Sequence, residues 1–199
     1  INSLFITTRH DTHAEYVKKG IESGKNVFVE KPLCLTYEEL EDLKKLDYSK
    51  GILMVGFNRR FAPHIIEMKE LLNTTTQPKT MVMMVNAGEI PAEHWTQDIE
   101  VGGGRIIGEA CHFIDLLRFL VDSKISSVQA IKINDTSQRV TDDKATITIT
   151  FADGSIGTVH YFANGHKSFP KERLEVFVDG KILSLDNFKT LTGYGWSKF

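Results

Sequence analysis

The first sixty residues alternate between two patterns of apolar and polar positions. Short, almost wholly apolar runs are typical of strands buried on both faces of a parallel sheet, and they lie at 3–7, 26–30 and 52–57. Between them, apolar residues recur at helical spacing in segments 11–24 and 36–46. Strand, helix, strand, helix, strand with short connections predicts right-handed crossovers and a parallel sheet covered by helices.

The ends of these two helices carry recognisable signals. Asp11 or Thr12 is placed to cap the first helix, and Gly24 is placed to end it. Thr36 and Glu39 have the spacing of a capping box at the start of the second helix.

The pattern changes after about residue 60. Pro63 begins a helix over 63–73, a strand follows at 80–88, and a second long helix over 105–121 follows three glycines. Beyond residue 126 the chain consists of strand after strand, with Asp-Gly dipeptides at 153–154 and 179–180 that favour tight hairpins. We therefore predict two domains, an α/β part over 1–60 and an α+β part with a large antiparallel sheet over 61–199.

Composition narrows the classes of function. The 199 residues are 41% hydrophobic and carry a formal charge of −2, so no basic surface for nucleic acid is expected. No run reaches the roughly eighteen apolar residues that span a membrane. We expect a cytoplasmic protein in which Cys34 and Cys111 are reduced thiols. Because the first residues already read as a strand, we interpret the chain as a fragment.

Polar side chains gather where the predicted parallel strands end. Glu30, Lys31 and Pro32 follow the second strand directly, and other polar residues follow the first and third. Parallel sheets bind ligands at the carboxyl ends of their strands, so these side chains predict a cleft at one edge. A lysine there can hydrogen-bond a substrate hydroxyl or take part in proton transfer. The alternative is a solvated Glu–Lys ion pair without a function.

The helix over 105–121 is the second candidate. Glu109, His112 and Asp115 are spaced three apart and share a helical face, and a histidine there can act as a general acid or base near neutral pH. The alternative is a structural histidine with satisfied hydrogen bonds. We expect no metal site, because Glu109 and His112 alone do not make one.

The segment before this helix gives weaker signals. Gly102 to Gly104 do not form a phosphate-binding fingerprint, since no buried strand leads into them; they indicate a close backbone approach to a ligand or a tight start to the helix. His94 and Trp95 belong either to a loop that faces substrate or to a tryptophan packed under the sheet.

Taken together, the order and spacing of these motifs resemble the Gfo/Idh/MocA family of oxidoreductases. The run TTRHDTHAEYVKKGIESGKNVFVEKPL resembles the family's segment from its T-P-x-x-x-H turn to its E-K-P signature. GFNRRFAPH resembles the exit from the dinucleotide domain, and GGGRIIGEACHFIDLLRFL resembles the family's D-x-G-x-H helix. The resemblance implies the C-terminal part of a Rossmann-like parallel sheet, followed by an α+β domain with a large, mostly antiparallel open sheet.

The resemblance also implies an activity. It points to hydride transfer between NAD or NADP and a hydroxyl carbon of a sugar, cyclitol or nucleotide-linked sugar, with Lys31 and His112 as the catalytic pair. The residues that it places near the cofactor are Thr8, Arg9, His10, His13, Glu30 and Lys31. Those that it places near the substrate are Asn58, Arg59, His94, Trp95, Glu109 and His112. The open sheet implies a homo-oligomer.

Departures from the family pattern limit these expectations. Gly108 stands where the family usually has an aspartate, so either Glu109 replaces that contact or the substrate differs. Arg9 stands where proline is common, and the sequence contains no Gly-rich phosphate loop. We therefore expect the fragment to be inactive alone. Two further hypotheses are a non-catalytic module that binds a sugar or nucleotide and a metal-dependent hydrolase that uses Glu109 and His112.

Overall fold

The computed structural model describes residues 1–134 and 142–197 and divides the chain into two compact units. The first unit combines residues 1–57 with 92–112, and the second combines 58–91 with 113–199. Segment 92–112 therefore groups with the N-terminal residues although it follows them by more than thirty positions. The predicted boundary after residue 60 assigns segment 92–112 to the second domain, and it stays a prediction.

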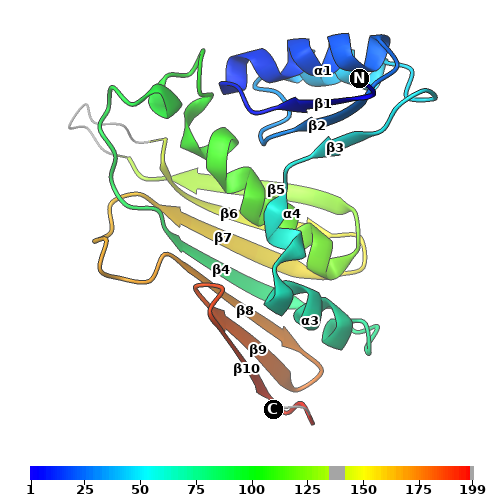
Figure 1. The fold of residues 1–199 in the computed structure, drawn as a ribbon. Coiled ribbons are helices and arrows are strands. Elements are labelled where there is room, and N and C mark those ends of the chain that lie inside the picture. The colour runs from blue at the N-terminus through cyan, green and yellow to red at the C-terminus, as the bar shows by residue number, and fades with distance from the viewer. Residues whose placement is uncertain (135–141, 198–199) are drawn as a thin grey trace. The chain divides into compact units, whose positions relative to one another are not determined.

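The first unit is a three-stranded parallel sheet with helices on one face (Figure 1). Its strands are ordered β1-β2-β3 and span Ser3–Ile6, Asn26–Val29 and Leu53–Val55. Its α-helices are α1 (His13–Glu22) and α2 (Tyr37–Lys44). Shorter turns are η1 (His10–Thr12), η3 (Trp95–Gln97) and the π-helical turn η4 (Ile106–Ala110).

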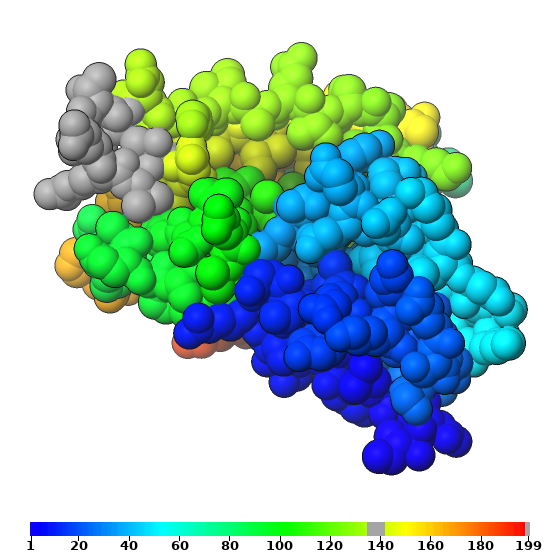
Figure 2. Space-filling view, turned by 90° about the horizontal axis from the view of Figure 1, so that it is seen from above, coloured from blue at the N-terminus to red at the C-terminus, as the bar shows by residue number. Residues whose placement is uncertain are grey.

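The core of this unit lies between the sheet and α1 and α2. Its most buried members are Ile6, Ala14, Val17, Ile21, Val27, Val29 and Leu43. Figure 2 shows residues 1–57 of this unit from above, in colours from blue to cyan.

The opposite face of the small sheet is exposed, which contradicts the prediction that its strands are buried on both faces. Phe5 pairs with Phe28, and Phe28 pairs with Met54, so the three side chains form one row across the sheet. Phe5 is 72% exposed and Met54 is 43% exposed. The apolar composition of the strands was read correctly, but among the described residues no helix covers this second face.

The predicted helix signals are partly confirmed. Thr36 and Glu39 form the capping box, and Gly24 ends the first helix with a φ of +64°. Thr12 is the N-cap of α1, but its hydroxyl donates to the carbonyl of Arg9 at 2.8 Å and makes no cap hydrogen bond. The 3-10 turn η1 lies immediately before α1, and the Thr12 hydroxyl bonds the residue that precedes this turn instead of capping α1.

The second unit is built on a seven-stranded sheet, in the order β10-β9-β8-β4-β7-β6-β5. All neighbours in the sheet are antiparallel except β4 and β7, so the predicted antiparallel fold class is confirmed with one parallel pair. The strands are β4 (Thr80–Asn86), β5 (Ile125–Lys132), β6 (Lys144–Phe151), β7 (Ile156–Phe162), β8 (Glu172–Val178), β9 (Lys181–Asp186) and β10 (Thr190–Tyr194). Three helical elements accompany them: η2 (Asn58–Phe61), α3 (Pro63–Leu72) and α4 (Cys111–Val121).

Helices α3 and α4 cover one face of this sheet (Figure 1). A Cβ added to Gly157 in β7 would lie 2.8 Å from Leu117, which shows how closely α4 packs on the strand. The buried side chains alternate along each strand, as in Met81, Met83 and Val85 of β4. The side chains of the other face are half-buried or exposed.

Candidate active site

The carboxyl ends of the small parallel sheet are joined by a buried histidine. His13 is fully buried, and its Nδ1 and Nε2 lie 2.7 Å from the carbonyl of Pro32 and 3.1 Å from that of Thr8. The turn after β1 is thereby tied to the turn after β2. These two turns form the rim of the site, and His13 is buried within it. The hydroxyl of Thr8 is exposed and bonded to that of Thr12 at 2.6 Å.

Lys31 leaves the second strand through a cis peptide bond to Pro32 and reaches the helix that follows the glycines. Its Nζ donates to the carbonyl oxygen of Gly108 at 2.9 Å. Gly108 lies in the π-helical turn η4, a rare kind of turn that is frequent at functional sites. The π turn therefore supplies the anchor for the lysine.

His112 lies four residues after Gly108, in the first turn of α4. Its ring is 7% exposed and meets the edge of Phe57 with centroids 6.1 Å apart. The structure thus brings Lys31 to the same stretch of chain that carries His112. Sequence reasoning missed Phe57, because nothing in its position distinguishes a ring against the site from an ordinary core residue.

The carboxylate of Glu109 is held within its own helix. Arg105 is almost fully buried, and its guanidinium lies 3.5 Å from the Glu109 carboxylate. Glu30 also lies at the rim, where its carboxylate is close to Gly56: a Cβ there would be 3.1 Å from a Glu30 oxygen. Its predicted contact with a cofactor stays a prediction.

The glycine segment folds back on the η3 turn. The backbone NH groups of Gly102 and Gly103 donate to the carbonyl of Asp98 at 2.8 and 3.0 Å. A Cβ at Gly102 would lie 2.5 Å from the carbonyl oxygen of Trp95, so only glycine fits there. Gly103 and Gly104 both have a φ of +74°, which glycine adopts without strain. These contacts match the predicted tight start to the helix.

His10 and Trp95 pack together beside the glycines. The two rings meet edge to face with centroids 4.7 Å apart, and His10 Nδ1 lies 2.8 Å from the carbonyl of Gly102. The guanidinium of Arg9 lies 5.9 Å from the centre of the Trp95 ring, and exposed His94 stacks on the same ring. Trp95 therefore belongs to the rim, and the alternative of a tryptophan under the sheet is wrong.

The protonation of His10 follows from its surroundings. Burial lowers the pKa of His10 below its ordinary value, and the positive charge of Lys31 lowers it further, against the opposing effect of the Gly102 hydrogen bond. A neutral imidazole that bonds a carbonyl must donate, so Nδ1 carries the proton at neutral pH.

Asn58 and Arg59 lie in the second unit. Arg59 makes two hydrogen bonds to the carboxylate of Glu172, at 3.0 and 2.6 Å, and its guanidinium lies over the rings of Phe113 and Phe188. An open hollow of about 330 Å³ is lined partly by Asn58, Arg59 and Glu172. Glu172 could not be predicted as the partner of Arg59, because the two residues are far apart in the chain.

Two absences hold for the part of the chain that the structure describes. No group of three histidine, cysteine, aspartate or glutamate side chains is placed to hold a metal ion. Within the same residues, none of the helices combines the length and apolar character that a bilayer crossing requires.

Comparison with known proteins gives consistent matches across the chain. Residues 1–57 match a family profile described as an oxidoreductase family with an NAD-binding Rossmann fold, and residues 77–183 match the GFO/IDH/MocA C-terminal domain. The chain is 32% identical over 167 residues to scyllo-inositol 2-dehydrogenase (NAD(+)) of Bacillus subtilis, which covers 80% of this chain and 48% of that protein. It is 26% identical to myo-inositol 2-dehydrogenase of Thermotoga maritima, over 96% of this chain and 58% of that protein.

A solved structure gives the same picture. The oxidoreductase domain protein from Kribbella flavida superposes with a TM-score of 0.83 at 25% identity, over 98% of this chain and 57% of that one. The chain spans about half the length of the curated relatives that it matches.

Proposed function

Because this chain belongs to the GFO/IDH/MocA oxidoreductase family, we propose that the whole protein is an NAD(P)-dependent dehydrogenase. It transfers a hydride between a nicotinamide and a hydroxyl carbon of a sugar, cyclitol or nucleotide-linked sugar. The inositol dehydrogenases among its relatives favour a polyhydroxylated ring. The observation that carries the proposal is Lys31, bonded to Gly108 one turn before His112.

In the proposed reaction, the two side chains divide the work on one hydroxyl group. His112 accepts the hydroxyl proton while the carbon–hydrogen bond breaks and the carbonyl forms, which lowers the barrier because the carbon gains positive character as hydride leaves. Lys31 holds the oxygen with a charge-assisted hydrogen bond. It has three donors, and only one of them is used by Gly108. When bound, the nicotinamide supplies the acceptor for the hydride.

The rim after β1 and β2 has the chemistry expected beside a nicotinamide and its ribose. Thr8 offers an exposed hydroxyl, Arg9 a guanidinium over Trp95, and Glu30 a carboxylate that can accept from ribose hydroxyls. We propose these residues as cofactor contacts, with His13 supporting them from beneath. The phosphate-cradling glycine loop of a Rossmann fold has no counterpart in this sequence.

The test is a titration with NADH and NADPH that follows nicotinamide fluorescence. It compares this chain with a longer polypeptide that carries a phosphate-binding loop before Ile1. We expect binding by the longer polypeptide alone, followed by oxidation of an inositol or sugar with reduction of NAD or NADP. If neither polypeptide binds, the dehydrogenase proposal fails, and a non-catalytic module that binds a sugar or nucleotide becomes the better reading.

We also propose that the open face of the large sheet binds a second copy of the chain. Paired residues place mostly half-buried side chains in rows across it, including Thr146, His160 and Met84. Seven strands about 4.8 Å apart, each about 23 Å long, give a face of roughly 750 Å². This is close to the roughly 800 Å² that each partner contributes to a standard interface.

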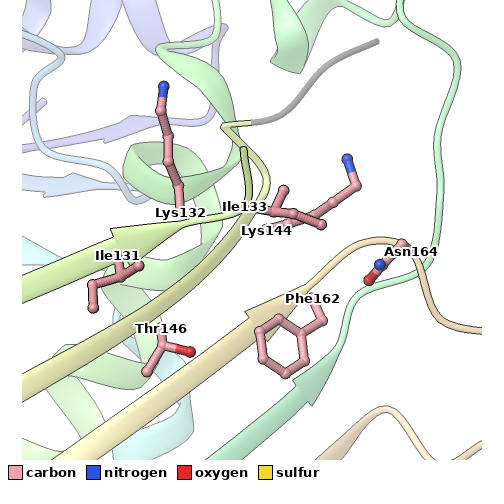
Figure 3. A pocket seen from close by; sticks show the side chains of 7 residues that line it. All are labelled: Ile131, Lys132, Ile133, Lys144, Thr146, Phe162 and Asn164. Atoms are coloured by element: carbon pink, nitrogen blue, oxygen red, sulfur yellow. The ribbon is translucent and has the colours of Figure 1, made fainter. Parts of the chain in front are cut away.

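One end of the open face is hollowed. Ile131, Thr146 and Phe162 lie beside a hollow of about 310 Å³, and the amino group of Lys132 points away from it (Figure 3). Nearby, His160 Nδ1 is 3.1 Å from the Thr146 hydroxyl. A surface of threonines, one histidine and partly exposed apolar side chains suits a partner with the same surface, because hydroxyls can both donate and accept.

A further inference from the structure

His10 is the buried side chain at which several segments of the first unit meet. It follows β1, packs on Trp95, bonds the carbonyl of Gly102 and borders Gly108. The next residue strengthens the same junction, because the backbone NH of Asp11 donates to the carbonyl of Val101 at 3.1 Å. The ring is 7% exposed, so most of its surface is used inside the protein.

His10 crowds the Cα of Gly108. A Cβ at position 108 would lie 3.0 Å from Cε1 and 3.3 Å from Nδ1 of the His10 ring, and 3.4 Å from the carbonyl oxygen of Gly102. Its φ lies outside the left-handed region, so the backbone alone would accept alanine. A side chain at 108 would therefore push the imidazole by a few tenths of an ångström.

The same glycine anchors the lysine. The carbonyl of Gly108 accepts from Lys31 Nζ at 2.9 Å, so a shift of this peptide moves the ammonium with it. His10 borders the Cα of Gly108 and bonds Gly102 with the same edge of its ring. Displacing the ring frees both the glycine segment and the peptide that holds the lysine.

We propose that His10 is a positioning residue that fastens the 98–104 segment and thereby holds the Gly108 carbonyl where it anchors Lys31. His10 acts through Gly102 and Gly108, not by contact with substrate or cofactor. Any effect of His10 on catalysis rests on the proposed dehydrogenase function. Its structural role in holding the 98–104 segment does not.

Because of the charges around His10, the strength with which it holds the 98–104 segment depends on pH. The ionisable groups that face it are Lys31, His13 and Asp11, with Arg9 on the Trp95 ring. Burial lowers its pKa, so the neutral ring is the form that fits. The contribution of this fit to stability is fully present above the ordinary histidine pKa of about 6.5 and is lost as the pH falls through the lowered value.

The first test uses the fluorescence of Trp95. The chain has two tryptophans, so Trp196→Phe leaves Trp95 as the single reporter. An imidazolium beside an indole quenches its emission, and we expect a transition with a midpoint below the ordinary histidine value. His10→Asn should remove this transition, whereas His94→Asn, which alters the exposed neighbour of the same ring, should leave it. A transition unchanged by His10→Asn would overturn the proposal.

The second test needs no tryptophan substitution and is hydrogen exchange of the full chain. His10→Ala and Gly108→Ala should each speed exchange of the Gly102 and Gly103 amides about tenfold, as expected for the loss of one buried hydrogen bond. His10→Asn keeps a donor near the position of Nδ1 and should restore slow exchange. Equal exchange in wild type and His10→Ala would reject the fastening. Because neither test measures catalysis, their failure leaves the dehydrogenase proposal standing.

Discussion

Lys31 shows how a single residue gains a function through the backbone of another element. Its ammonium donates to the carbonyl of Gly108, which lies in the π-helical turn η4. An arginine would not be equivalent, since its planar fork suits carboxylates, whereas a compact ammonium can bond one carbonyl and still offer donors to a substrate oxygen.

We expect Lys31→Met and His112→Asn to lower kcat by about 10²- to 10⁴-fold in the whole protein, because each removes a group that acts on the reacting hydroxyl. Binding of NADH, followed by nicotinamide fluorescence, should change little. Lys18→Met, on the exposed side of α1, is the matched control and should retain full activity. Full turnover by either Lys31→Met or His112→Asn would refute the role proposed for that residue.

At the level of single residues, the sequence indicates candidate side chains but not the groups that they contact. Lys31, His112 and Trp95 were singled out from spacing and resemblance, and all three belong to the first unit. The Lys31–Gly108 bond was not foreseeable, because it depends on the π turn rather than on a side chain. Arg59 was predicted to contact substrate, but the structure pairs its donors with Glu172, so that role stays a prediction.

At the scale of elements, local signals were read more reliably than tertiary ones. The capping box, the Pro63 helix start and the Asp179-Gly180 hairpin depend on a few adjacent residues, and all are present. Strand β10 was missed although threonine and tyrosine favour strands, because the run has only five residues and a glycine interrupts it. The exposed face of the small sheet was missed, because composition does not show what covers a strand.

The capping box gives a prediction for α2. Thr36→Ala removes the acceptor for the Glu39 amide and should lower the free energy of unfolding of the first unit by about 1 kcal/mol. Thr36→Ser keeps a hydroxyl and should lose much less. Chemical denaturation followed by circular dichroism measures both, and an unchanged midpoint for Thr36→Ala would show that the box does not stabilise the helix.

At the scale of the whole molecule, the proposed self-association can be tested on the open face of β6. Thr148→Arg places a charge on a half-buried position of β6 and should give a monomer in sedimentation velocity, because two copies of the charge would meet in a symmetric interface. Glu70→Arg, on the exposed surface of α3, is the control and should leave the assembly intact. If wild type is itself a monomer at high concentration, the interface proposal fails.

The central position of β4 in the large sheet has a consequence for synthesis. β4 ends at Asn86, but its two neighbours, β7 and β8, begin only at Ile156 and Glu172. The ribosome adds about 5 to 20 residues per second, so β4 waits for several seconds with both edges unpaired. During that interval Met81, Met83 and Val85 have no sheet to pack in, and the nascent chain is then most open to chaperones and to aggregation.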